Sequence, residues 1–151
     1  MANSYTQIYI HLIFAVQSRA SIIKESFRID TEQYISKIIT RRNSKTISIY
    51  CNPDHIHILV GLNPSNTVSD LVRDIKSGSS KWINQEKLVV GRFAWQEGYG
   101  AFTYSKSQLD SVCKYILNQP MHHRNVKFKD EYISFLNKYN IDYDEKYLFD
   151  W

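Results

Sequence analysis

Residues 45–62 are predicted to form two strands joined by a tight turn, and this hairpin constrains the fold more than any other segment. Asn52-Pro53-Asp54 supplies turn residues between two runs that alternate as strands. Side chains alternate faces along a strand, so His55 and His57 should share one face while the neighbouring isoleucines enter a core. We therefore expect a sheet with one apolar face and two imidazoles on the other.

Strands and helices alternate along the rest of the chain. In chain order the expected elements are a strand over 5–16, a helix from the caps Asp30 and Thr31 to Asn43, the hairpin, a helix over 67–84, a short strand over 101–104, a helix over 107–119 and a last helix over 128–140. Pro120 should end the third helix, because proline cannot continue one. The aromatic tail over 143–151 is expected to dock on a surface.

This order, β-α-β-β-α-β, is typical of an α+β, ferredoxin-like antiparallel sheet with two helices on one face, here with extra C-terminal helices. The chain has 151 residues and no internal repeat or Pro/Gly-rich linker, so residues 1–151 are read as a single domain.

Composition excludes several classes of protein. The chain is 43% hydrophobic and 23% charged, which is ordinary for a globular domain rather than a disordered or fibrous one. No apolar stretch approaches the roughly 18–20 residues that cross a bilayer, and the first residues do not resemble a secretory signal. We therefore expect a cytoplasmic protein without a membrane partner. Cys51 and Cys113 lack a metal-ligand spacing and are expected to be buried free thiols.

The charge of +4 and the pI of about 9.0 permit a polyanionic partner but do not demand one. The aromatic content of 14% could serve unstacked bases and phosphates, yet aromatic residues also simply fill cores. Composition alone therefore favours nucleic acid only slightly.

Two paired motifs carry candidate chemistry. His55 and His57 form a half-site for a divalent cation, although two such histidines can also be solvated polar residues. Tyr115 and Gln119 are four residues apart on a predicted helix and should share a face. The Gln119 amide oxygen could bind a hard cation beside the Tyr115 hydroxyl. Two imidazoles and an amide would leave the charge of the ion uncancelled, so that it could polarise a phosphodiester.

A tyrosine hydroxyl is a poor nucleophile unless a metal, a base or an aligned substrate assists it. Its attack on phosphorus would leave a covalent phosphotyrosine and a free 3′-hydroxyl, and the same site could then rejoin strands without ATP. Tyr115 is one of eleven tyrosines, however, and a helical tyrosine usually serves packing or the surface.

The segment Pro53-Asp54-His55-Ile56-His57 resembles the HUH motif (His, hydrophobic, His) of single-stranded DNA nucleases. Residues 115–119, Tyr-Ile-Leu-Asn-Gln, resemble the tyrosine helix of the single-tyrosine, TnpA-type insertion-sequence transposases. Residues 5–14, 71–83 and 95–102 are also similar to blocks of that family, so the resemblance runs nearly end to end.

The resemblance implies an enzyme that cleaves and rejoins single-stranded DNA at mobile-element ends through a 5′-phosphotyrosine, and that recognises hairpins near them. Tyr115 would be the nucleophile, and His55, His57 and Gln119 would hold Mg²⁺ or Mn²⁺. It further implies a homodimer with composite active sites, in which the tyrosine helix of one subunit serves the histidine pair of the other. Such a protein would associate with the nucleoid when bound to DNA.

Several basic and histidine residues are secondary candidates. The residues expected to contact DNA phosphates lie on the second helix and after Pro120: Arg73, Lys76, Lys81, Arg124 and Lys127. His122 and His123 could add ligands, although a solvated turn is the more ordinary prediction. His11 is either structural or a neighbour of the site.

Two other functions remain open. One is a related HUH enzyme that acts on host repeats or initiates replication, although enzymes of replication usually carry further domains. The other is a non-catalytic nucleic-acid-binding module, because ferredoxin-like sheets also occur in RNA-binding proteins. Such a module would show stacking aromatics on its central strands, where this chain carries histidines, so the pattern favours catalysis.

Overall fold

The computed structural model describes residues 4–124 and 126–148, and its centre is a four-stranded antiparallel sheet with the strand order β2-β3-β1-β4. The strands are β1 (Tyr9–Ala15), β2 (Lys45–Cys51), β3 (His55–Gly61) and β4 (Gly100–Thr103). The central strand β1 pairs with β3 on one side and with β4 on the other. The predicted hairpin is present, since β2 pairs with β3 across the turn at residues 52–54.

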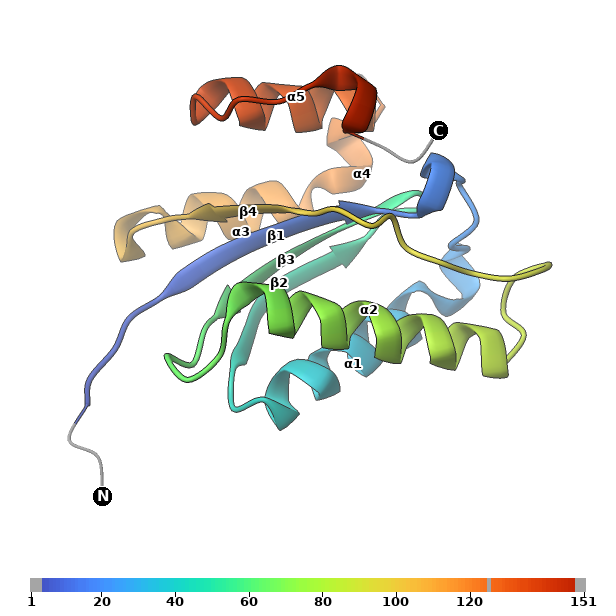
Figure 1. Ribbon diagram of the computed structural model, residues 1–151, viewed down its shortest axis with the longest axis horizontal. Coiled ribbons are helices and arrows are strands. Elements are labelled where there is room, and N and C mark those ends of the chain that lie inside the picture. The colour runs from blue at the N-terminus through green and yellow to red at the C-terminus, as the bar shows by residue number, and fades with distance from the viewer. Residues whose placement is uncertain (1–3, 125, 149–151) are drawn as a thin grey trace.

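Helices cover both faces of this sheet (Figure 1). Their bounds are α1 (Glu25–Arg41), α2 (Val68–Gln85), α3 (Leu109–Leu117), α4 (Gln119–His122) and α5 (Phe128–Lys138), with short 3₁₀ turns at Gln17–Arg19, Lys106–Gln108 and Glu145–Tyr147. The helices α1 and α2 lie on one face, and α3, α4 and α5 lie on the other (Figure 1). The expected α+β fold with extra C-terminal helices is confirmed.

The face toward α1 and α2 is the aliphatic core of the molecule. Alternate residues of the two central strands enter it, among them Phe14 of β1 and Ile58 of β3, both with no exposed area. Ile35 and Ile39 of α1 and Ile75 of α2 close the core from the helix side. This is the periodicity that places an apolar stripe of a helix on an apolar face of a sheet.

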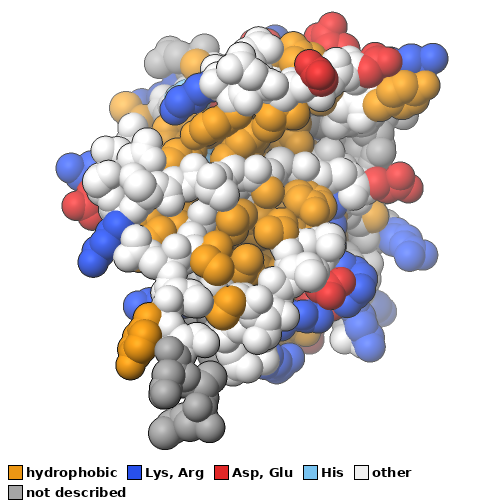
Figure 2. All heavy atoms as spheres, turned by 60° about the vertical axis from the view of Figure 1, so that its left-hand side comes forward, with side chains coloured by type: hydrophobic (Ala, Val, Ile, Leu, Met, Phe, Trp, Pro, Cys, Tyr) orange, Lys and Arg blue, Asp and Glu red, His pale blue; other side chains and the backbone are white. Residues whose placement is uncertain are grey.

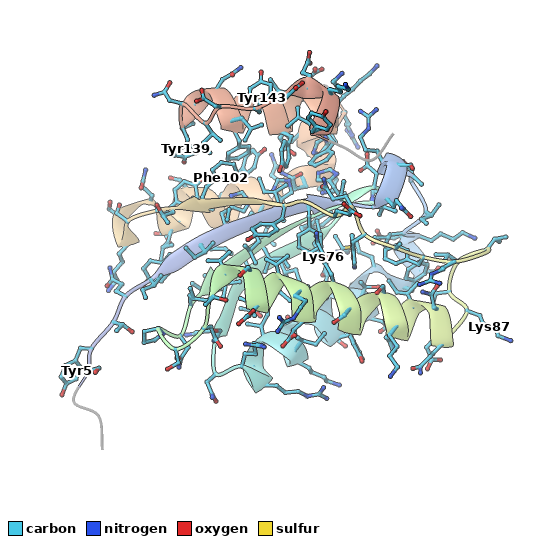
Figure 3. All side chains as sticks on the ribbon, viewed as in Figure 1. Tyr5, Lys76, Lys87, Phe102, Tyr139 and Tyr143 are labelled. Carbon is cyan, nitrogen blue, oxygen red and sulfur yellow. The ribbon has the colours of Figure 1, made fainter. Side chains whose placement is uncertain are left out.

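The opposite face is covered in two parts. The helix α3 packs Val112 and Ile116 against Leu59 of β3, whereas α5 packs Phe128 and Tyr132, among others, on β1 and β4. Phe102 of β4 stacks with Tyr139 just after α5, with ring centroids 5.0 Å apart (Figure 3). Between these two helical contacts lie the imidazoles of β3.

Several expected helix ends differ from the observed ones, and two of the differences have a clear physical reason. The first helix begins at Glu25 rather than at Asp30 or Thr31, because Phe27 extends the buried stripe by one turn toward the N-terminus. Thr31 is buried inside the helix, where its hydroxyl donates to the Phe27 carbonyl. The third helix ends at Leu117, and Pro120 lies in the first turn of α4, where its missing N–H is not needed.

The C-terminal tail is seen to dock at Leu148, which packs beside α5 and whose carbonyl accepts a hydrogen bond from Gln96 Nε2 at 3.3 Å. Tyr147 is largely exposed, and residues 149–151 lie outside the described residues. Cys51 is a buried free thiol as expected, and Cys113 is free and half-buried. Within the described ranges, no helix is both long and apolar enough to cross a membrane.

Candidate active site

The two histidines of β3 lie on the same face, as their spacing predicts, but they are not solvated. His55 is 1% exposed and His57 is fully buried, because α4 and α5 close over this part of the sheet. Ile56 and Ile58 enter the opposite core. Because these imidazoles are shielded from solvent, their hydrogen bonds to other protein groups determine how each ring is oriented.

Each imidazole is held through its Nδ1 atom. His55 Nδ1 donates to Asp54 Oδ1 at 2.7 Å, and His57 Nδ1 is paired with His11 Nε2 at 2.9 Å. His123 Nδ1, from the end of α4, donates to the Val126 carbonyl at 2.6 Å. The three Nε2 atoms consequently face one shared point, and His11 is a neighbour that fixes the ring of His57.

That point is occupied by Glu131, a carboxylate of α5 that is 3% exposed. Its Oε1 lies 3.0 Å from His57 Nε2, 3.2 Å from His123 Nε2 and 3.4 Å from His55 Nε2. The ligand atoms of these four residues all lie within 4.8 Å of one another. Glu131 is thus a buried carboxylate in contact with three imidazoles through one of its oxygens.

Tyr115 of α3 and Gln119 of α4 contact the same cluster. The Tyr115 hydroxyl donates to Glu131 Oε2, and its ring centroid lies 5.7 Å from that of His57. Gln119 is fully buried, and its Oε1 lies 2.8 Å from His123 Nε2 and accepts a hydrogen bond from Asn52. The fold thus brings together, within one chain, the four residues that the sequence singles out.

The electrostatics of the cluster set the protonation of its members. Burial alone would raise the pKa of Glu131, but hydrogen bonds with His123, His55 and His57 outweigh it and hold that pKa far below its ordinary value. Burial lowers the pKa of His57 to about 4. Burial and the adjacent Glu131 charge raise the pKa of Tyr115. The carboxylate is therefore ionised, while the phenol retains its proton at neutral pH.

Two hollows open beside the cluster. A cavity of about 550 Å³ between α3 and α5 reaches Tyr115, His122 and Glu131. A second, of about 720 Å³, reaches His55, His123 and Lys127. Figure 2 brings forward the side where α3 begins and α5 ends, and it shows hydrophobic side chains gathered in the upper and middle part of this face with charged side chains at the margin. Tyr115 can thus be approached from outside although it contacts buried groups.

The basic candidates fall in two places. Arg73, Lys76 and Lys81 border a hollow of about 840 Å³ along α2. Arg124 and Lys127 are exposed, and Lys127 lines the second hollow beside His55. Lys76 points from α2 toward the loop before β4 (Figure 3), where its Nζ donates to the carbonyls of residues 96, 97 and 98. Lys76 is therefore a loop anchor as well as a basic residue.

Sequence reasoning overlooked Glu131 and gave too little weight to His123. The prediction of a solvated turn is wrong for His123, whose ring is half-buried and hydrogen-bonded at both nitrogens. A usable signal existed in each case. Glu131 lies three residues after Phe128 and four before Phe135, so it interrupts the apolar stripe of its helix, and His123 lies one turn beyond Gln119.

The sequence profile of IS200-like transposases ("Transposase IS200 like") matches residues 4–119, which end at Gln119. This chain belongs to the IS200-like transposase family. The ISDra2 transposase TnpA of Deinococcus radiodurans is 25% identical to it over 119 residues, covering 75% of this chain and 84% of that protein. As a member of this transposase family, the chain is a DNA-processing enzyme, and α5 lies beyond the residues that match the profile.

Solved structures agree in fold. A crystal structure from Deinococcus radiodurans R1, assigned as a transposase, superimposes with a TM-score of 0.62 and 21% identity, covering 79% of this chain and 95% of that one. A REP-associated tyrosine transposase bound to a REP hairpin superimposes with a TM-score of 0.61 and 15% identity, covering 83% of this chain and 74% of that one. At these identities the likeness concerns the arrangement of the transposase fold.

Proposed function

We propose that this transposase cleaves and rejoins single-stranded DNA at the ends of a mobile element through a covalent 5′-phosphotyrosine on Tyr115. One observation carries the proposal. The Tyr115 hydroxyl shares a single cluster with His55, His57 and Gln119, although these residues come from β3, α3 and α4. A nucleophile beside a set of cation ligands is the arrangement that phosphoryl transfer requires.

The donor atoms suit the divalent cation that the family implies. The Nε2 atoms of His55 and His57 are turned toward the cluster because their Nδ1 atoms are engaged elsewhere, and Gln119 offers an amide oxygen beside them. These residues would hold Mg²⁺ or Mn²⁺, which when bound supplies the positive charge that polarises a phosphodiester oxygen.

Tyr115 performs the bond exchange. Its oxygen forms a bond to phosphorus as the bond from phosphorus to the 3′-oxygen breaks, and the leaving oxygen takes up a proton to become a 3′-hydroxyl. The phenol gives up one proton in the same step to the pair formed by Glu131 Oε2, which accepts its hydrogen bond, and His122 Nε2, which lies 3.1 Å from that oxygen and 3.4 Å from the hydroxyl. The phosphotyrosine keeps the ester linkage, so a 3′-hydroxyl of another strand can reverse the reaction without ATP.

The proposed substrate is single-stranded DNA with hairpin ends. A fold relative is seen bound to a REP hairpin, and this chain presents basic residues both at the α2 hollow and near His55. We propose that Arg73, Lys76, Lys81, Arg124 and Lys127 contact its phosphates. A homodimer with composite sites is also proposed by family resemblance, although within one chain Tyr115 already contacts its own cluster.

The alternative of an RNA-binding module is not favoured, because such a module reads bases on an open sheet face. Here α3, α4 and α5 cover the face that carries His55 and His57 (Figure 1). A domesticated nuclease acting on host repeats would use the same cluster, so it differs from the main proposal only in the DNA that it cleaves.

A labelled single-stranded hairpin, Mn²⁺ and a denaturing gel test the proposal. We expect a covalent protein–DNA adduct that Tyr115→Phe abolishes and that EDTA suppresses. Tyr147→Phe, a change of the same kind at an exposed tyrosine, should leave the adduct unchanged. An adduct that survives Tyr115→Phe would refute the nucleophile, and binding without any adduct would indicate a non-catalytic protein.

A further inference from the structure

Glu131 is the part of the site that the family resemblance does not explain. It lies on α5, twelve residues beyond the last residue that matches the family profile. Its side chain nevertheless enters the histidine cluster and is 3% exposed. A buried carboxylate is costly unless it is paired and hydrogen-bonded, so the groups that face Glu131 decide its role.

The imidazoles that face Glu131 present their Nε2 atoms to it. His55 and His123 each donate their Nδ1–H to an oxygen, Asp54 Oδ1 and the Val126 carbonyl. In a singly protonated ring the other nitrogen, Nε2, then carries a lone pair. The same holds for His57 when its Nδ1 donates to His11. Without a cation the Nε2 protons of these rings hydrogen-bond to Glu131, and with one the three Nε2 lone pairs and the carboxylate oxygen are its ligands.

The spacing of these atoms supports the same conclusion. Metal–ligand bonds of about 2.0–2.2 Å place neighbouring ligand atoms about 3.0–3.5 Å apart in octahedral or tetrahedral sites. Glu131 Oε1 lies 3.0, 3.2 and 3.4 Å from the Nε2 atoms of His57, His123 and His55. Nε2 is also the atom through which a histidine binds metal when its Nδ1 is fixed by a second residue.

We propose that Glu131 and His123 are ligands of the same metal centre as His55 and His57, so that α5 completes the site with a carboxylate. This inference rests on the proposed function and deepens it. Three imidazoles and one carboxylate favour Mn²⁺ over Mg²⁺, which prefers oxygen ligands.

The second oxygen of Glu131 gives this assignment a further role. Oε2 accepts a hydrogen bond from the Tyr115 hydroxyl and lies 3.4 Å from Gln119 Nε2. One carboxylate therefore contacts the ligand cluster with one oxygen and orients the nucleophile with the other. Glu131 is in this respect a positioning residue, because it acts on the reaction through Tyr115.

The test is a titration of the metal-free, full-length protein with Mn²⁺, followed by isothermal calorimetry and by Mn²⁺ electron paramagnetic resonance. Glu131→Gln keeps the shape of the side chain and removes its charge, and we expect it to weaken Mn²⁺ binding at least about tenfold. Asp130→Asn is the matched control, since it removes the charge of an exposed neighbour on the same helix and should change the affinity less than about twofold. His123→Asn should weaken binding in the same direction as Glu131→Gln.

Equal affinities in Glu131→Gln and Asp130→Asn would overturn the proposal. Should Glu131→Gln fail to fold, as judged by circular dichroism, His123→Asn decides in its place, and unchanged binding by that variant would overturn the assignment. The adduct assay on the same preparations separates the two proposals. If the wild-type protein forms a Tyr115-dependent adduct but Glu131→Gln binds Mn²⁺ as tightly as the wild type, only the assignment of the new ligands is refuted. If the wild-type protein forms no adduct, the proposed function itself is refuted.

Discussion

The two faces of the sheet are built from the same strands but by different principles. Toward α1 and α2, residues such as Ile58 and Phe14 form a continuous aliphatic core. Toward α3, α4 and α5, the intervening positions carry His11, His57 and Leu59, and the helices that cover them bring a carboxylate instead of more aliphatic groups. The face toward α1 and α2 therefore contributes mainly to stability, whereas part of the area buried on the face toward α3, α4 and α5 belongs to polar groups.

The difference shows where function can be placed without losing the fold. The apolar face is closed by two long helices of 17 and 18 residues, which follow from sequence periodicity and pack independently of the polar cluster. The polar face is closed by shorter helices of 9, 4 and 11 residues, whose small apolar clusters flank the histidines. Adjacent residues on one strand should therefore differ in their contributions to the free energy of unfolding and to metal binding.

The largest expected effect compares Ile58 with Leu59, which are adjacent, fully buried and on opposite faces of β3. Ile58→Ala should lower the free energy of unfolding by about 3–5 kcal/mol, because it leaves a cavity in the main core. Leu59→Ala should cost about 2 kcal/mol, since α3 can shift into the space. Urea denaturation of both variants measures the difference. A larger loss for Leu59→Ala would show that the polar face, rather than the apolar one, holds the fold.

Periodicity allowed most of the fold to be predicted from sequence, and the bounds of β2 were predicted to the residue. Four residues of the buried cluster were also singled out, because His55 and His57 alternate on one strand and Tyr115 and Gln119 are one turn apart. Burial of the histidines and the role of Glu131 could not be predicted in this way. They depend on how α5 docks across the sheet, where the contact between His57 and Glu131 joins positions 74 residues apart in the chain.

A second effect should appear only on the polar face. His11→Ala removes the partner of His57 Nδ1, so the ring loses its fixed orientation, and we expect Mn²⁺ affinity to fall about tenfold to hundredfold, or about 1.4–2.7 kcal/mol. Ile10→Ala changes the neighbouring residue, which faces the other core, and should reduce stability without changing the affinity of the folded protein. Calorimetric titration of the two variants checks this, and equal losses of affinity would mean that the faces are coupled.

The smallest expected effect concerns a polar contact within the apolar face. The indole N–H of Trp95 donates to Ser79 Oγ at 2.9 Å, and both residues are buried between α2 and the loop before β4. Ser79→Ala leaves that donor without its partner and should cost about 1–2 kcal/mol of unfolding free energy. Ser77→Ala, an exposed position on the same helix, should be nearly neutral. This contact lies on the opposite face of the sheet from the histidine cluster and shares no residue with it. Mn²⁺ affinity should therefore be unchanged in both variants. A drop in affinity for Ser79→Ala alone would show that stability of the apolar face is transmitted to the metal ligands, and the division between the two faces would then have to be abandoned.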